Sequence, residues 1–434
     1  MNCIAHTAID RQSKRFAASA MRRPHKIAWV AMLLVVSACA AAQTEPVPAK
    51  VYDVMYTVKP YPRRGTVAVE MRVEQVRRFL REVTMKMPEA RFSGFSGDGE
   101  ISRDGDALSW RPAVTGGVLR WTVKVANVRY GDKYDAWLGK DWGLFRASDI
   151  IPPADTRTVV GAHSQTSLQF DLPDKWSAVT QYNDRRGIYS IKNTGRRFDR
   201  PAGWMLLGKI GVRIETISGV RVVVAGPLGQ AVRRLDMLAL MHWTLPEVTK
   251  VLPDFPKRIA IVSAAASMWR GGLSGPQSLY LHADLPLISE NATSTLLHEI
   301  MHIGSGLRAA NGADWIVEGL AEYYSLELLR RSRTISNERF KDALADLAEW
   351  GKEADVLCTD ASTAAATARA VGVFAALDRE LQQRTMNSDA LDELLRALVA
   401  NGDIVSVSDL RRLAKAEAGS MPRALSNTNL PGCG

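Results

Sequence analysis

Cysteine and histidine are scarce in this chain of 434 residues, which holds four cysteines and seven histidines. So few cysteines cannot build the disulfide framework that replaces a hydrophobic core in small secreted domains. Hydrophobic residues make up 46% of the chain and charged residues 24%, which excludes an intrinsically disordered protein. The length exceeds what one ordinary core needs, so two domains are expected.

A strongly basic surface is also missing, although the formal net charge is +10. Residues 1–38 account for +5 of this charge, with six Lys or Arg residues and one acid, Asp10. The remaining basic residues are scattered or occur in pairs, without a stripe of Lys and Arg interleaved with aromatic residues. We therefore expect no nucleic-acid partner.

The apolar run from Ile27 to Val36 is too short for a comfortable transmembrane helix. It follows a basic segment at 22–26 and ends in small residues, an order typical of a secretory signal that starts most naturally at Met21. We therefore predict a leader over residues 1–38, a flexible tether over 39–50, and export to the periplasm or cell envelope.

The end of the leader reads Val-Ser-Ala-Cys and resembles a bacterial lipobox, in which Cys39 becomes the lipidated first residue. This interpretation predicts attachment to a membrane through a lipid anchor. The alternative is ordinary signal cleavage after Ala40 or Ala42, which would discard Cys39.

Two further cysteines, Cys358 and Cys433, remain after the leader is removed. In an oxidising compartment an even pair favours a disulfide, here one that would hold the C-terminal tail. Two free thiols are the alternative, because the sequence does not supply the distance between them.

The first half of the chain has the periodicity of β-structure. Segments 67–73 and 119–125 alternate apolar and polar side chains with period two, which is typical of strands with one buried face. Turn-forming Gly and Asp residues cluster at 97–99 and 103–106. Short strands with little helix predict an N-terminal β-sandwich-like domain over residues 51–225.

The period changes after Gly226-Pro227, and residues 226–434 are predicted to form a second, mainly α-helical domain. The chain is therefore expected to have an α+β multidomain fold. The predicted helices cover residues 230–243, 291–304, 314–332, 336–350, 362–384, 387–400 and 407–418, and two predicted strands cover 257–263 and 278–282, with a loop at 271–276.

Two of the rare histidines stand four residues apart in the segment 296–302, Leu-Leu-His-Glu-Ile-Met-His. On a helix His298 and His302 share one face, so both imidazoles can bind one metal ion. Glu299 is then placed to hold a metal-activated water and take its proton. An ordinary amphipathic helix with hydrogen-bonded histidines is the alternative, but it leaves the segment 315–324 unexplained.

A catalytic zinc ion needs three protein ligands and one open position. Glu318 is the best third ligand, because turns at 304–306 and 311–314 bring a second helix back antiparallel to the first. Glu322 lies one helical turn further on the same face and can accept a hydrogen bond from the free N–H of a ligand histidine. A solvated helix face is the alternative for both glutamates, but their apolar neighbours disfavour it. We predict one Zn²⁺ per chain.

These residues carry a family resemblance. Segment 298–324 resembles the catalytic core of the gluzincin metallopeptidases, closest to the glycyl aminopeptidase family and more distantly to the aminopeptidase N family. Its second part, Trp-Ile-Val-Glu-Gly-Leu-Ala-Glu-Tyr-Tyr at 315–324, is similar to their Trp-x-x-Glu-Gly-Phe-x-x-Tyr-Tyr pattern. Residues 271–273 resemble the start of their Gly-Gly-Leu-Glu-His motif, and 372–381 resemble their Lys-Gly-x-Leu-Val-x-x-x-Leu-Asp helix.

The resemblance, which covers roughly residues 225–400, implies a thermolysin-like catalytic domain behind the β-rich domain. It implies that a peptide or protein substrate is hydrolysed by a metal-activated water, with Glu299 as general base. It also implies substrate contacts for Gly271, Gly272 and Ser274. However, Ser274 stands where relatives carry the glutamate that recognises the substrate's α-amine, and a hydroxyl cannot replace a carboxylate there. Endopeptidase and aminopeptidase action therefore both stay open.

The family's usual oxyanion donor is also absent. Relatives use a Tyr or His that follows the ligand glutamate, but no Tyr follows Tyr324 and no His follows His302. The position of the aminopeptidase N tyrosine is taken by Arg369, whose guanidinium could stabilise an oxyanion if the helix aims it at the metal. A surface side chain is the alternative for Arg369. The sequence thus predicts an exported zinc metallopeptidase, with a non-catalytic zinc-binding cell-envelope protein derived from such a peptidase as the alternative.

Overall fold

The structure is a computed structural model that describes residues 50–433 apart from Thr194. The described residues belong to one compact unit with an α+β fold. The predicted leader, most of the tether and the candidate lipidation site Cys39 lie outside the described residues. No helix in the described part of the chain is long and apolar enough to cross a membrane.

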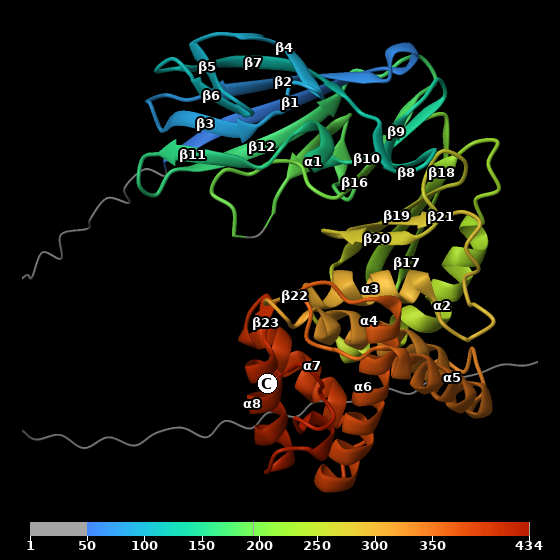
Figure 1. Cartoon of the computed structure of the whole chain (residues 1–434). Coiled ribbons are helices and arrows are strands. Elements are labelled where there is room, and N and C mark those ends of the chain that lie inside the picture. Colours follow the sequence, from blue (N-terminus) through green and yellow to red (C-terminus); the bar gives the residue numbers. More distant parts are fainter. Residues whose placement is uncertain (1–49, 194, 434) are drawn as a thin grey trace, which may run out of the picture. The chain divides into compact units, whose positions relative to one another are not determined.

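The N-terminal part of this unit consists of three β-sheets that share one hydrophobic core (Figure 1). The alternation of apolar and polar residues produces this arrangement. In the first strand Tyr52, Val54 and Tyr56 are buried, whereas Asp53 is exposed. The seven-stranded sheet has the order β14 (Asp184–Arg185), β15 (Ile188–Ile191), β12 (His163–Phe170), β1 (Val51–Tyr61), β2 (Thr66–Glu74), β7 (Gly116–Lys124) and β4 (Phe92–Gly97).

Two smaller sheets complete this part. The four-stranded sheet has the order β11 (Ala154–Thr158), β3 (Leu80–Lys86), β6 (Ala107–Arg111) and β5 (Glu100–Asp104). The five-stranded sheet has the order β13 (Ser177–Val179), β16 (Trp204–Gly208), β10 (Trp142–Arg146), β9 (Lys133–Leu138) and β8 (Asn127–Tyr130), and a short helix α1 (Ala147–Ile150) follows β10.

A second five-stranded sheet underlies the candidate metal centre. Its order is β17 (Ile210–Ile217), β18 (Val220–Pro227), β19 (Arg258–Ala264), β21 (Ser278–His282) and β20 (Gly272–Gly275). Strand β18 pairs in parallel with β19, so this sheet crosses residue 225, where the sequence places a domain boundary. The boundary follows a local Gly-Pro break, which carries no information about a strand partner some 40 residues later.

The prediction of a loop at 271–276 was wrong, because Gly272–Gly275 forms the edge strand β20. Gly, Ser and a single Leu offer little side-chain signal for a strand. Backbone hydrogen bonds to β21 stabilise it instead, with Gly272 opposite Leu281 and Ser274 opposite Leu279.

Helices make up the C-terminal part and pack around a second core. Six of the predicted helices are present with ends shifted by a few residues. α2 continues past its predicted end at residue 243 and through Pro246, because Leu245, Val248 and Val251 are buried in this core and offset a proline cost of about 3 kcal/mol. The helices are α2 (Arg234–Val251), α3 (Thr295–Ser305), α4 (Asp314–Arg331), α5 (Asn337–Trp350), α6 (Ala364–Thr385), α7 (Ala390–Asn401) and α8 (Val407–Ala418), with a two-stranded β22 (Arg308–Ala309) and β23 (Ile404–Val405) and 3₁₀ turns at Pro62–Arg64, Gly351–Glu353 and Arg423–Leu425.

Candidate metal centre

Helix α3 is oriented by its apolar face and by a capped start. The Ser294 side chain accepts a hydrogen bond from the Leu297 N–H, so the helix begins at Thr295, four residues after the predicted start. Leu297 and Ile300 are fully buried, so the opposite face carries His298 and His302, both partly exposed. Figure 1 shows α3 beside α4 and next to β20.

The two histidines and Glu318 of α4 turn their ligand atoms toward one point. His298 Nε2 lies 3.0 Å from His302 Nε2, and the Glu318 carboxylate oxygens lie 3.2 Å from His298 Nε2 and 3.5 Å from His302 Nε2. In a tetrahedral zinc site with bonds of about 2.0–2.1 Å, donor atoms are about 3.3 Å apart. The three groups could therefore hold one metal ion.

Glu322 contacts the outer nitrogen of the same imidazole. His298 Nδ1 donates to a carboxylate oxygen of Glu322 at 2.8 Å. This contact places a ring proton on Nδ1, so Nε2 is the nitrogen of His298 that could bind a metal ion.

The carboxylates of Glu318 and Glu322 favour a positive charge at His298. Burial lowers the pKa of His298, but the Glu318 and Glu322 carboxylates raise it more, to about 10. Burial raises the pKa of Glu318, but hydrogen bonds from His298 and His302 bring it well below its usual range. Without a metal ion, protonated His298 supplies the positive charge that the Glu318 and Glu322 carboxylates require. A divalent cation would replace this proton.

Glu299 lies at the interface between α3 and the edge strand β20. It is only 6% exposed, and within the described part of the chain no side chain forms an ion pair with its carboxylate. A Cβ atom at Gly272 would lie 3.2 Å from Glu299 Oε1 and 2.5 Å from Thr295 Cγ2. Gly272 therefore leaves the space that the Glu299 carboxylate occupies.

The other residues predicted to contact substrate have different surroundings. Gly271 packs directly on the Trp269 ring, since a Cβ there would be 1.7 Å from a ring carbon. Ser274 is half-buried in β20. Between them, the Leu273 carbonyl accepts a hydrogen bond from the Trp204 indole at 2.8 Å. The sequence analysis missed Trp204, because no local pattern connects residues 69 positions apart.

Arg369, the candidate oxyanion donor, and the two tyrosines of α4 all form hydrogen bonds elsewhere. Arg369 Nη1 donates to the Ala354 carbonyl at 2.6 Å, which ties α6 to the turn after α5. The hydroxyls of Tyr323 and Tyr324 donate to Asp378 at 2.6 Å and Asp392 at 2.8 Å. Arg369 is half-buried in this contact, whereas the sequence left open an oxyanion donor or a surface side chain. In the described residues none of these three side chains donates to the metal-ligand group.

The remaining cysteines are joined in the structure. Cys358 and Cys433 form a disulfide with an Sγ–Sγ distance of 1.97 Å and a Cα–Cα distance of 5.1 Å. It links the C-terminal tail to the segment before α6, which is the pairing expected for an oxidising compartment.

Comparisons with known proteins support the resemblance seen in the sequence. No family model and no curated protein matches the chain. Among solved structures, an aminopeptidase N family protein from Idiomarina loihiensis has a TM-score of 0.63 at 12% identity, over 86% of this chain and 73% of that one. An M1 zinc metallopeptidase from Deinococcus radiodurans has a TM-score of 0.53 at 14% identity, over 89% and 94%.

A third structure, native yeast LTA4 hydrolase, has a TM-score of 0.57 at 11% identity, over 88% of this chain and 67% of that one. At such low identity these likenesses establish the fold alone. The chain has the fold of the M1 zinc metallopeptidases and resembles the gluzincins, as its motifs predict.

Proposed function

We propose that this chain is an exported zinc metallopeptidase that hydrolyses peptide bonds. One observation carries the proposal: the Nε2 atoms of His298 and His302 lie 3.0 Å apart, and each has a Glu318 carboxylate oxygen within 3.2–3.5 Å, next in the helix to the buried Glu299. Two imidazoles and a carboxylate in tetrahedral spacing suit Zn²⁺. The structural neighbours include zinc metallopeptidases, which supports the same choice.

In this proposal zinc and Glu299 have separate roles in hydrolysis. Zinc, when bound, supplies Lewis-acid activation of water and of the substrate carbonyl. Glu299 accepts the proton of the attacking water and then delivers it to the leaving amine. Its carboxylate is suited to this because no side chain in the described residues neutralises it and little bulk water reaches it.

The edge strand β20 would orient the substrate. Its inner side pairs with β21, and no strand in the described part of the chain pairs with its outer side. An extended peptide can add to such an edge through backbone hydrogen bonds. Because Gly272 of β20 lies against Glu299, a peptide paired there would pass the general base.

Recognition of the substrate's N-terminal amine distinguishes aminopeptidase from endopeptidase action. The Ser274 hydroxyl supplies no charge to hold a terminal ammonium ion, so cleavage within a chain is favoured. A matched pair of peptides with free and acetylated N-termini tests this, and a strong preference for the free amine would establish an aminopeptidase.

The disulfide between Cys358 and Cys433 supports export, because such bonds are rare in the cytosol. Attachment through Cys39 remains a prediction from the sequence. Mass spectrometry of the mature protein from its native membrane fraction tests it, since lipidation leaves Cys39 as a modified first residue.

Substitution of the general base is the central test. Glu299→Gln should retain stoichiometric zinc but cleave a broad peptide library at least about 10²-fold more slowly than the natural chain. Glu349→Gln, an exposed glutamate on α5, is the matched control and should cleave normally. Cleavage at the normal rate by zinc-loaded Glu299→Gln would overturn the proposal.

A second function has its own support. The hydroxyls of Tyr323 and Tyr324 and the Arg369 guanidinium are all hydrogen-bonded away from the metal-ligand group. This favours, as the alternative, a zinc-binding cell-envelope protein without catalysis. A purified, zinc-loaded chain that cleaves nothing in the library would establish it.

A further inference from the structure

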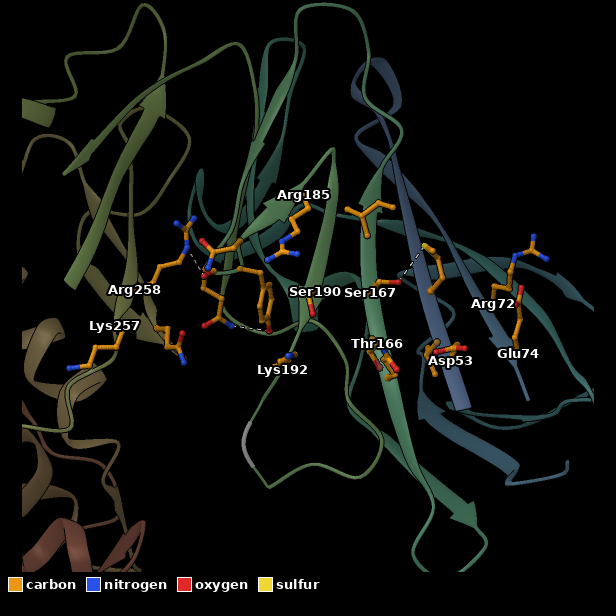
Figure 2. A pocket seen from close by; sticks show the side chains of 18 residues that line it. Asp53, Arg72, Glu74, Thr166, Ser167, Arg185, Ser190, Lys192, Lys257 and Arg258 are labelled. Carbon is orange, nitrogen blue, oxygen red and sulfur yellow. Dashed lines mark hydrogen bonds between the residues drawn. The ribbon is translucent and has the colours of Figure 1, made fainter. Parts of the chain in front are cut away.

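A cavity of about 1060 Å³ opens on the outer face of the seven-stranded sheet (Figure 2). Side chains of β1, β2, β12 and β15 line it, together with residues at the start of β19. None of the metal-ligand residues takes part. Its volume lies at the upper end of the roughly 300–1000 Å³ of most small-molecule sites.

One wall of this cavity is basic. It is formed by Arg185, Lys192, Lys257 and Arg258. Among residues 50–433 none of these four side chains forms an ion pair, and the neighbouring Asp184 accepts from the Gly187 N–H within its own turn.

Arg258 is held in a fixed position within this wall. Its Nε donates to the Gln181 carbonyl at 2.8 Å and its Nη2 to the Thr180 carbonyl at 3.3 Å. The side chain is half-buried, and burial together with Arg221 lowers its pKa. Asp184 raises this pKa only in part and, among the described residues, forms no ion pair with Arg258, so an anion that enters the cavity would stabilise the half-buried guanidinium.

The opposite wall carries two carboxylates, Asp53 and Glu74, beside Arg72, whose charge is paired with Glu70 at 3.0 Å. Asp53 and Glu74 face each other as cross-strand neighbours of β1 and β2, and in the described residues neither forms an ion pair. Two like charges directly opposite one another destabilise a sheet, and a cation between them would relieve this. Figure 2 shows Lys257 and Arg258 at one side, Asp53 and Glu74 at the other, and Ser190 and Ser167 between them.

We propose that this cavity binds an extended polypeptide segment with acidic residues at one end and basic residues at the other. The acidic end faces the basic wall, the basic end faces Asp53 and Glu74, and polar backbone groups meet the serines between. The inference deepens the proposed peptidase function, on which it rests, by assigning a substrate class: proteins that carry such a segment away from the scissile bond.

Binding is measured first, on the zinc-loaded Glu299→Gln chain, so that no cleavage intervenes. The probe is a fluorescent twelve-residue peptide with four Glu, four Ser or Gln and four Lys in that order, followed by anisotropy. A peptide of the same composition with alternating charges should bind at least about tenfold more weakly, because it cannot match both walls.

Two double variants assign this binding to the cavity. Arg185→Glu with Lys257→Glu should weaken the block peptide at least tenfold, whereas the same reversal at Lys341 and Lys415, exposed lysines outside the cavity, should not. Asp53→Asn with Glu74→Gln should abolish the preference for the block peptide over an all-Glu peptide. Equal binding of block and alternating peptides would overturn the proposal, as would binding of pyrophosphate or anionic vesicles without peptide binding.

Cleavage then separates this inference from the proposed function. A scissile peptide is compared with the same peptide carrying the charged block on a flexible linker. The Arg185→Glu with Lys257→Glu variant should lower the ratio of kcat/KM for the tailed over the short peptide, mainly through KM. If the short peptide is cleaved but the charged block has no effect, the cavity proposal alone is overturned. If the block peptide binds but no peptide is cleaved, the peptidase proposal alone is overturned.

Discussion

Nδ1 of His298 lies 2.8 Å from a carboxylate oxygen of Glu322, while Nε2 of the same ring lies 3.2 Å from Glu318. The two glutamates are one turn apart on α4, so a single helix holds both nitrogens of one imidazole. The candidate metal centre is therefore built from two helical spacings of four residues, one on α3 and one on α4.

Glu322→Gln should weaken zinc binding by about 10–100-fold. An amide still reaches Nδ1, but it carries no charge, so the ring becomes a less basic ligand. Competition with a chromophoric chelator measures the affinity, and Glu349→Gln is the control. Unchanged affinity would show that Glu322 does not support the ligand.

Gly272→Ala should separate metal binding from catalysis. The added methyl would lie 2.5 Å from Thr295 Cγ2 and 3.2 Å from Glu299 Oε1, so Thr295 and Glu299, the proposed general base, must move. The displacement of Glu299 should lower kcat/KM by up to about 100-fold, whereas zinc content should stay the same.

Gly372→Ala on α6 is the matched control, because its Cβ would meet nothing within 4 Å. That change should leave activity intact and stabilise the helix by about 0.5–1 kcal/mol. Normal activity in both variants would contradict the place assigned to Gly272.

The sequence could predict the metal-ligand residues because their geometry is local. Spacings of four on two helices define which side chains share a face, and the turns between residues 304 and 314 reverse the chain. The Trp204–Leu273 contact, the edge strand β20 and the bipolar cavity depend instead on strands that meet from distant parts of the chain. Asp53 and Glu74 look like two ordinary surface acids until the register of β1 and β2 places them face to face.

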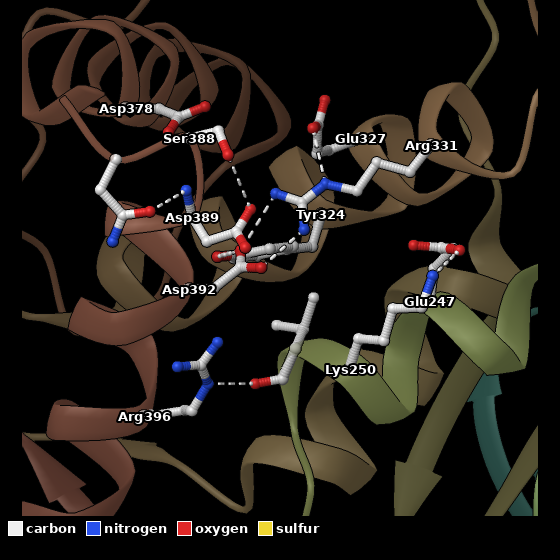
Figure 3. A network of polar contacts seen from close by, with 12 residues as sticks. Glu247, Lys250, Tyr324, Glu327, Arg331, Asp378, Ser388, Asp389, Asp392 and Arg396 are labelled. Atoms are coloured by element: carbon white, nitrogen blue, oxygen red, sulfur yellow. Dashed lines mark hydrogen bonds and ion pairs between the residues drawn. The ribbon is translucent and has the colours of Figure 1, made fainter. Parts of the chain in front are cut away.

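Asp392→Asn should destabilise the helical part, because the Asp392 carboxylate is the centre of a buried network (Figure 3). It accepts two hydrogen bonds from Arg331, at 2.6 and 3.0 Å, and one from the Tyr324 hydroxyl. Removal of one partner from a buried ion pair costs about 3–5 kcal/mol. Urea denaturation measures the loss. Asp389→Asn, an exposed acid in the same region, should change the free energy of unfolding by less than about 0.5 kcal/mol.

The C-terminal tail has a contact that depends on pH. The Glu380 carboxylate on α6 accepts hydrogen bonds from the Arg423 and Ala424 N–H groups, at 2.9 and 3.1 Å, and pairs with Arg384. Burial raises the pKa of Glu380, but the two backbone N–H groups and Arg384 lower it more, so the pKa lies below its usual range. A carboxylate with a lowered pKa in the folded state stabilises that state above its unfolded pKa and loses this contribution as pH falls through the folded pKa.

In the natural chain, acid should therefore weaken the contact between Glu380 and the C-terminal tail. The Glu380→Gln variant should lack this pH dependence. Between about pH 6 and pH 3, hydrogen exchange at the Arg423 and Ala424 amides should become faster in the natural chain, after correction for intrinsic rates. In Glu380→Gln these amides should exchange fast, because a neutral amide accepts weaker hydrogen bonds than a carboxylate. The corrected rate should not change over this pH range, because the substituted amide side chain does not titrate. Glu349→Gln, which lies outside this contact, should follow the natural chain. An unchanged pH dependence in Glu380→Gln would show that another group holds the tail, and the Cys358–Cys433 disulfide should limit the opening to the segment before it.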